Sequence, residues 1–105
     1  MQGLSEQHRI PVVEHVKDVV PTIRIQFGVT RIGIFGSCVR GEQTNTSDVD
    51  VLVELKEGYK TLRNFVALAD YLESLLDRKV DLITVEGLDP YIQPYVEREV
   101  IWLEG

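Results

Sequence analysis

Two short segments of the chain carry residues that could handle a phosphorylated substrate. Gly36 and Ser37 end one apolar run, and Asp48 and Asp50 begin the next, with eleven residues from Ser37 to Asp48. The backbone N–H groups of a glycine-serine turn can bind a phosphate, especially where a helical turn begins. Two carboxylates can bind a divalent cation such as Mg²⁺. The spacing therefore suggests a site for a nucleoside triphosphate with its metal ion.

The two aspartates are expected on one face of a strand. Residues 48–54 alternate between polar or acidic and apolar side chains, which is typical of a half-buried strand. Side chains two apart on a strand lie about 7 Å apart, and their repulsion is about 2 kcal/mol at an effective dielectric near 20. A bound cation would offset that cost. An isolated Asp-x-Asp pair is more often a solvated strand end, so this motif is weak by itself.

Asp81 is a third carboxylate, within the apolar segment Val80-Asp81-Leu82-Ile83. An unpaired carboxylate in an apolar strand is costly. If this strand lies beside the one carrying Asp48 and Asp50, three carboxylates converge and could hold two metal ions. Asp81 could also act as a general base toward an attacking hydroxyl. The alternative is a charge on an edge strand that faces water.

Arg40 lies one helical turn beyond Ser37. Its guanidinium could pair with a phosphate or form a structural ion pair with Glu42 or Asp48. The sequence favours neither role over the other.

The apolar periodicity predicts helix, strand, strand, helix, strand, helix and a closing strand. This order predicts one domain, residues 1–105, of the α+β (α/β two-layer) class, with a small mixed β-sheet flanked by helices. The expected elements are a helix over 10–27, strands over 31–35 and 48–54, a helix over 62–76, a strand over 79–85, a helix from 89 to about 96 and a strand over 100–103.

Prolines and one glycine predict where helices begin, bend and end. Pro11 suits a first helical turn, whereas Pro21 should kink or split the same helix. Gly28 is expected to cap its end. Asp89 followed by Pro90 predicts the start of the last helix.

The composition narrows the class of partner. The 105 residues are 44% hydrophobic and 27% charged, with a formal net charge of -6 and scattered basic residues, so direct binding of nucleic acid is not expected. Cys38 is the single cysteine and can form no internal disulfide, which fits a reducing compartment. No signal-like or membrane-spanning apolar segment is seen, so a soluble, cytoplasmic protein without a membrane partner is expected.

Together these segments resemble the nucleotidyltransferase superfamily related to DNA polymerase beta. The resemblance is specifically to its minimal nucleotidyltransferase (MNT) branch, the partner of HEPN proteins in bacterial and archaeal toxin–antitoxin pairs. It covers nearly the whole chain and departs at Cys38-Val39, where relatives often carry a basic or aromatic residue and then alanine. The motifs that carry it are Phe35-Gly36-Ser37, Arg40-Gly41, Ser47-Asp48-Val49-Asp50 and Val80-Asp81-Leu82.

The resemblance implies an enzyme that transfers AMP from Mg²⁺-ATP to a hydroxyl, with pyrophosphate leaving. Asp48, Asp50 and Asp81 would then be the catalytic and metal-binding triad, for which two Mg²⁺ ions are expected. The acceptor in this family is thought to be a tyrosine of the HEPN toxin.

The resemblance also assigns the nucleotide-binding residues. Gly36 and Ser37 would hold the triphosphate of ATP, and Arg40 would support them. Ser47, which belongs to the Ser-Asp-x-Asp signature, is assigned to nucleotide binding as well.

Two other functions remain open. The chain could be a binding module that neutralises its partner by occlusion. It could also transfer a nucleotide to a small molecule of the aminoglycoside type, although those enzymes use an additional domain that a chain of this length lacks. A homo- or hetero-oligomer is possible in each case, and Tyr91, Tyr95 and Trp102 are candidates for a core or for a docking surface.

Overall fold

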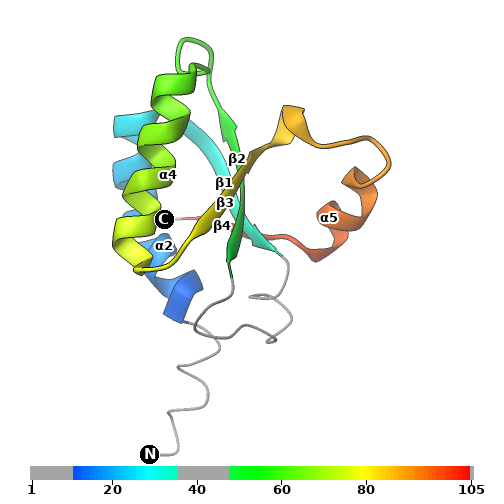
Figure 1. The fold of residues 1–105 in the computed structure, drawn as a ribbon, viewed down its shortest axis with the longest axis horizontal. Coiled ribbons are helices and arrows are strands. Elements are labelled where there is room, and N and C mark those ends of the chain that lie inside the picture. Colours follow the sequence, from blue (N-terminus) through cyan, green and yellow to red (C-terminus); the bar gives the residue numbers. More distant parts are fainter. Residues whose placement is uncertain (1–10, 36–47, 105) are drawn as a thin grey trace, which may run out of the picture.

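Four strands form one mixed sheet in the order β3-β2-β1-β4. The computed structural model describes residues 11–35 and 48–104, and Figure 1 shows their arrangement. This architecture confirms the predicted α+β class, including the closing strand. The elements are α2 (Pro11–Phe27), β1 (Val29–Phe35), β2 (Val49–Leu55), α4 (Leu62–Leu76), β3 (Val80–Thr84), the 3₁₀ turn η1 (Val85–Gly87), α5 (Gln93–Glu99) and β4 (Ile101–Leu103).

The order of the strands follows from how each is connected. β1 pairs with β2 and β4 in the antiparallel sense, whereas β2 and β3 are parallel. Parallel neighbours require a crossover connection, and α4 supplies it between β2 and β3. As a result β2 and β3 begin at the same end of the sheet.

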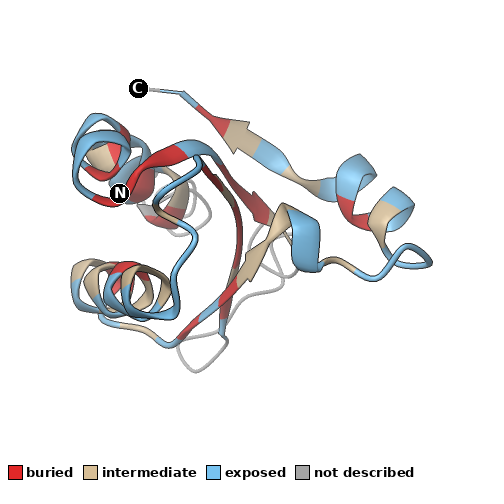
Figure 2. Cartoon of the chain, turned by 90° about the horizontal axis from the view of Figure 1, so that it is seen from above, coloured by how far each residue is buried: buried red, intermediate tan, exposed pale blue. Residues whose placement is uncertain are grey.

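One face of the sheet is covered by α2 and α4, and α5 lies on the other side (Figures 1 and 2). Val49, Val51 and Val53 of β2 are completely buried toward the two helices, which confirms the predicted alternation. On the opposite face Leu52 is buried as well, so the core continues partly onto that side. No helix in the described ranges is long and apolar enough to cross a membrane.

α2 is continuous across Pro21, so the predicted split of this helix is wrong. Proline removes one hydrogen bond to the carbonyl four residues earlier, here that of Lys17. Both Pro21 and Lys17 are exposed, so water can satisfy that carbonyl. Val20 and Ile23 are buried against the core and hold the helix on both sides of the proline.

Gly28 ends α2 in the left-handed conformation, with φ of 70°, which confirms it as the helix cap. A Cβ at this position would lie 2.2 Å from the ring of Tyr59, so a larger residue would collide with that side chain. The Asn64 side-chain amide donates to the carbonyl oxygens of Phe27 at 2.8 Å and Tyr59 at 2.9 Å. These contacts fasten the end of α2 to the start of α4.

α5 begins one turn later than the sequence predicted, at Gln93. The Asp89 carboxylate accepts the Tyr91 N–H at 2.8 Å, and the Asp89 carbonyl accepts the N–H groups of Ile92 and Gln93, both at 2.9 Å. Asp89 and Pro90 therefore build a separate turn before the helix. An aspartate can cap a turn as readily as a helix, which explains why the predicted start was wrong.

Candidate active site

Asp50 and Asp81 occupy the same register position on the neighbouring parallel strands β2 and β3. Each is the second residue of its strand. Their sequence neighbours Val49, Val51 and Val80 are buried beneath the helices, so both aspartates project from the opposite face. Asp50 is half-buried and Asp81 is exposed. Neighbouring strands are about 4.8 Å apart, so the sheet places two negative charges next to each other.

Asp48 lies immediately before β2 and is exposed. Among the residues that the structure describes, no group of three His, Cys, Asp or Glu side chains is arranged to hold a metal ion. The structure thus brings Asp50 and Asp81 together, and Asp48 lies two residues from Asp50 along the chain. The metal-binding role of all three stays a prediction.

The start of β3, directly before Asp81, is fixed from two sides. The Glu73 carboxylate on α4 accepts the Val80 N–H at 3.0 Å. The Val49 N–H donates to the Lys79 carbonyl at 2.9 Å, which ties the start of β2 to the residue before β3. The position of Asp81 relative to β2 therefore depends on Glu73 as well as on the sheet.

Glu73 was missed in the sequence, although one signal was present. It lies in the last turn of α4, where the helix dipole disfavours an acidic side chain. The bond to Val80 offsets that penalty and satisfies an N–H group on the edge strand of the sheet.

Gly36, Ser37, Arg40 and Ser47 lie outside the described residues. The described chain leaves the sheet at Phe35, which is the register partner of Asp50. Gly36, the first predicted nucleotide-binding residue, therefore follows directly after Phe35 in the sequence, and Phe35 lies opposite Asp50 in the sheet.

The same face of the sheet requires a glycine at position 33. A Cβ on Gly33 would lie 2.5 Å from Cγ2 of Val100 and 3.0 Å from Cε3 of Trp102. Only the absence of a side chain allows these residues to approach β1 so closely. The lack of a side chain at Gly33 thus lets the segment between α5 and β4 pack closely against the face that carries Asp50.

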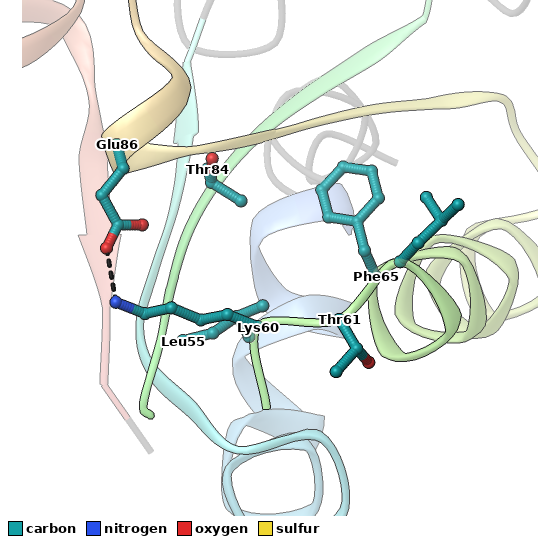
Figure 3. Close-up of a pocket in the computed structure, with 7 residues that line it drawn as sticks. Leu55, Lys60, Thr61, Phe65, Thr84 and Glu86 are labelled. Atoms are coloured by element: carbon teal, nitrogen blue, oxygen red, sulfur yellow. Dashed lines mark hydrogen bonds and ion pairs between the residues drawn. The ribbon is translucent and has the colours of Figure 1, made fainter. Parts of the chain in front are cut away.

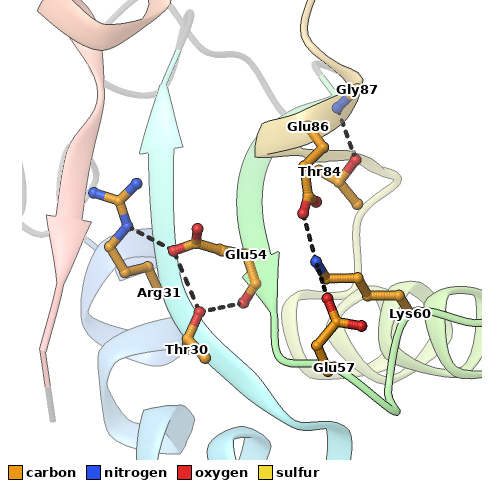
Figure 4. A network of polar contacts seen from close by, with 8 residues as sticks. All are labelled: Thr30, Arg31, Glu54, Glu57, Lys60, Thr84, Glu86 and Gly87. Carbon is orange, nitrogen blue, oxygen red and sulfur yellow. Dashed lines mark hydrogen bonds and ion pairs between the residues drawn. The ribbon is translucent and has the colours of Figure 1, made fainter.

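Arg31 joins three strands on this face. Its Nε atom lies 3.2 Å from Oε1 of Glu54 on β2 (Figure 4). Its guanidinium lies 4.1 Å from the ring centre of Trp102 on β4. The Thr30 hydroxyl donates to the Glu54 carbonyl at 3.0 Å. Trp102 is therefore part of the sheet, unlike Tyr91 and Tyr95, which are exposed.

A pocket of about 360 Å³ lies at the other end of β2 and β3 (Figure 3). It lies where the two parallel strands end, so it is separate from the aspartates, which lie where they begin. Its lining combines apolar side chains with hydroxyl and charged groups. The lining residues are Leu55, Lys60, Thr61, Leu62, Phe65, Thr84 and Glu86.

Ion pairs join the charged groups at this pocket (Figure 4). Lys60 Nζ lies 2.6 Å from Glu86 and 3.2 Å from Glu57. Hydrogen bonds to Glu86 and Glu57 raise the pKa of Lys60, and the bond from Lys60 lowers the pKa of Glu86. The Thr84 hydroxyl accepts the Gly87 N–H at 3.1 Å. These polar groups form a structural junction between α4 and η1.

Comparison with known proteins identifies the family to which this chain belongs. Residues 16–103 match the family described as "Nucleotidyltransferase domain". The protein adenylyltransferase MntA of Thermococcus cleftensis is 46% identical over 81 residues, which cover 77% of this chain and 81% of that protein. The family match spans β1, β2 and β3, and so includes all three predicted carboxylates.

Solved structures show the same fold. The structure of a minimal nucleotidyltransferase is 35% identical, with a TM-score of 0.76, and the match covers 88% of this chain and 93% of that one. A tri-AMPylated Shewanella oneidensis HEPN toxin in complex with MNT antitoxin gives a TM-score of 0.58 at 21% identity over 96% of this chain and 72% of that chain. At 21% identity, the match to the toxin–antitoxin complex shows a shared fold and no more. The chain belongs to the nucleotidyltransferase family, within the branch of the MntA-like protein adenylyltransferases.

Proposed function

We propose that this chain transfers AMP from ATP to a hydroxyl of a partner protein, a tyrosine of a HEPN-family toxin, and acts as the antitoxin. The observation that carries the proposal is the shared register of Asp50 and Asp81 in a chain whose residues 16–103 match the nucleotidyltransferase family. The relative from Thermococcus cleftensis is a protein adenylyltransferase, which favours a protein as the acceptor.

The donor set of the site fits a hard divalent cation. Like charges in neighbouring register positions destabilise a sheet by up to about 1 kcal/mol, and carboxylate oxygens are the ligands that Mg²⁺ prefers. Asp48, Asp50 and Asp81 would hold the metal, with two Mg²⁺ ions expected. When bound, Mg²⁺ neutralises charge that develops on the phosphoryl oxygens.

The chain's own groups supply the proton transfer. The acceptor oxygen forms a bond to the α-phosphorus of ATP, while the bond from that phosphorus to the oxygen bridging toward the β-phosphorus breaks. The Asp81 carboxylate accepts the proton of the attacking hydroxyl, and pyrophosphate leaves with the bonding electron pair. Asp81 suits this role because it is exposed and can reach a hydroxyl presented by a partner.

The triphosphate is assigned to Gly36 and Ser37, with Arg40 and Ser47 as supporting contacts. Their motif spacing supports this assignment, and so does the pairing of Phe35 with Asp50. Residues 1–105 are proposed to work as a single domain, since the match to the minimal nucleotidyltransferase covers 93% of that chain. We place the activity in the cytoplasm, where ATP is available and Cys38 stays reduced.

The test is to incubate the purified chain with ATP, Mg²⁺ and its HEPN-family partner and to measure the intact mass of the partner. The proposal expects an increase by one or more AMP groups, absent with Asp50→Asn. A tight complex that carries no adduct, with every nucleotide and metal tried, would instead support neutralisation by occlusion.

A further inference from the structure

Three large apolar side chains are exposed on α5 and the turn before it. Tyr91 is 87% exposed, Ile92 52% and Tyr95 64%, and we call these three residues the α5 patch. Val96 of the same helix is buried, so α5 carries apolar side chains on two of its sides. Exposed tyrosines on a fixed element are typical of protein interfaces, where the ring is buried and the hydroxyl remains hydrated.

The α5 patch belongs to the side of the sheet that carries the aspartates. α5 lies across the sheet from α2 and α4 (Figures 1 and 2), and the side chains of Asp50 and Asp81 project away from those two helices. Ile101, two residues after α5, pairs with Ile34, and Ile34 pairs with the residue after Asp50. The strand that follows α5 therefore begins one register position away from the position of Asp50.

The patch is held in place before any partner binds. Asp89 accepts the Tyr91 N–H, and the Val100 N–H donates to the Val96 carbonyl at 2.8 Å as α5 ends. Val100 then lies against Gly33 on β1. A surface that is already ordered loses less conformational entropy on binding than a mobile one.

The charge around the patch indicates the kind of partner. Residues 89–99 contain three acidic residues and one basic residue, Arg98, whose guanidinium lies 5.1 Å from the ring centre of Tyr95. A second copy of this chain would bring the same acidic rim against itself. A partner with an apolar centre surrounded by Lys and Arg complements the patch better.

We propose that the α5 patch is the docking surface for the acceptor protein, which binds through an apolar centre with a basic rim. A protein docked there would lie on the same side of the sheet as Asp50 and Asp81, to which it would present its hydroxyl. This inference rests on the proposed function, because it takes the acceptor to be a protein.

The test compares two sets of three substitutions at exposed apolar positions. The first set removes the patch with Tyr91→Ser, Ile92→Ser and Tyr95→Ser. The control set, Ile25→Ser, Leu62→Ser and Val66→Ser, replaces side chains on α2 and α4 that are 82%, 76% and 47% exposed. Thermal melting and circular dichroism confirm that each variant folds, and titration calorimetry gives the Kd for the HEPN-family partner.

The α5 variant is expected to raise the Kd for the partner at least tenfold and to keep the wild-type melting shift with Mg²⁺-ATP. The control variant is expected to bind the partner like the wild type. Wild-type affinity of the α5 variant, equal weakening of both variants, or no binding by the wild-type chain would overturn the proposal. A wild-type homodimer that the α5 substitutions dissociate would assign the patch to a second copy instead.

These outcomes are separable from failure of the proposed function. If the wild type binds the partner but leaves no AMP on it, transfer fails while the Kd values still decide the docking surface. If the wild type transfers AMP and the α5 variant has the same KM for the partner, docking fails while transfer stands.

Discussion

At one end of the parallel strands β2 and β3, Asp50 and Asp81 place two negative charges in the same register position. At the other end, Lys60 joins Glu57 and Glu86 across the β2–α4 connection and η1. The pairs at the second end satisfy each other and hold the fold together. At the first end two negative charges lie side by side, and a bound cation would reduce the repulsion between them. The ion pairs at one end stabilise the fold, and the like charges at the other end belong to the proposed active site.

The sharpest way to break this comparison is to remove one charge from the aspartate end. Asp50→Asn keeps the shape of the side chain and should lower the AMP-transfer rate about a thousandfold, as expected for losing a group that stabilises transition-state charge. Single-turnover transfer to the HEPN-family partner measures this effect. A loss below tenfold would mean that Asp50 does not act on the reacting groups.

Gly33→Ala tests how the face with the aspartates is built. The new Cβ would lie 2.5 Å from Val100, so β4 or β1 must shift. Overpacking of this kind should lower the free energy of unfolding by about 1–3 kcal/mol. Urea denaturation measures the change. Gly58→Ala is a poor control because the φ of Gly58 is 90°.

Glu73 tests whether the start of β3 must be held for transfer. Glu73→Ala removes the acceptor of the Val80 N–H and should lower kcat about tenfold through misplacement of Asp81, with KM for ATP unchanged. Glu73→Gln retains an oxygen acceptor and should restore most of kcat. Equal kcat values for the two variants would show that Glu73 has no positioning role.

Local sequence patterns predict individual elements of this fold but not the register between strands. The alternation over residues 48–54 and the apolar stripe of α4 are local patterns, so the strand, the helix and the buried face of each followed from them. The register that sets Asp50 beside Asp81 depends on pairing across the intervening α4, and no local pattern fixes it. From the sequence, convergence of the three carboxylates was conditional on the two strands being neighbours. The structure shows that they are neighbours and that Asp50 and Asp81 share a register position.

The errors have physical causes of the same kind. Pro21 was expected to kink or split α2, and the split does not occur because burial of Val20 and Ile23 outweighs one missing hydrogen bond. Asp89 caps a turn, so α5 starts later than predicted. Glu73 could not be assigned a role because its partner, the Val80 N–H, belongs to the next strand.

Asp81→Asn should also have a small effect on stability in the absence of metal. Removing one of two like charges on neighbouring strands should raise the free energy of unfolding by up to about 1 kcal/mol. Urea denaturation of the metal-free protein at neutral pH measures it. A decrease would show that the carboxylate of Asp81 stabilises the fold rather than the reaction.

The smallest expected effect is the pH dependence at the Lys60 end. The pKa of Glu86 is lowered from its usual 4.5, so its contribution to stability is present above that value and is lost as the pH falls through the lowered pKa. The pKa of Lys60 is raised above 10.5, so its contribution is present below that value and is lost as the pH rises through the raised pKa. The Tm difference between wild type and Lys60→Met should be constant between these limits and shrink below pH 4.5. A difference that grows in acid would contradict the ion pair.

The measurement that tests the central claim most directly places the same chemical change at each end of the strand pair. Asp81→Asn and Glu86→Gln each convert one carboxylate to an amide, at the beginning of β3 and just beyond its end. The rate of AMP transfer to the HEPN-family partner should fall by orders of magnitude in Asp81→Asn and stay within about twofold of wild type in Glu86→Gln. Equal losses in both variants, or full activity of Asp81→Asn, would contradict the assignment of catalysis to the aspartate end.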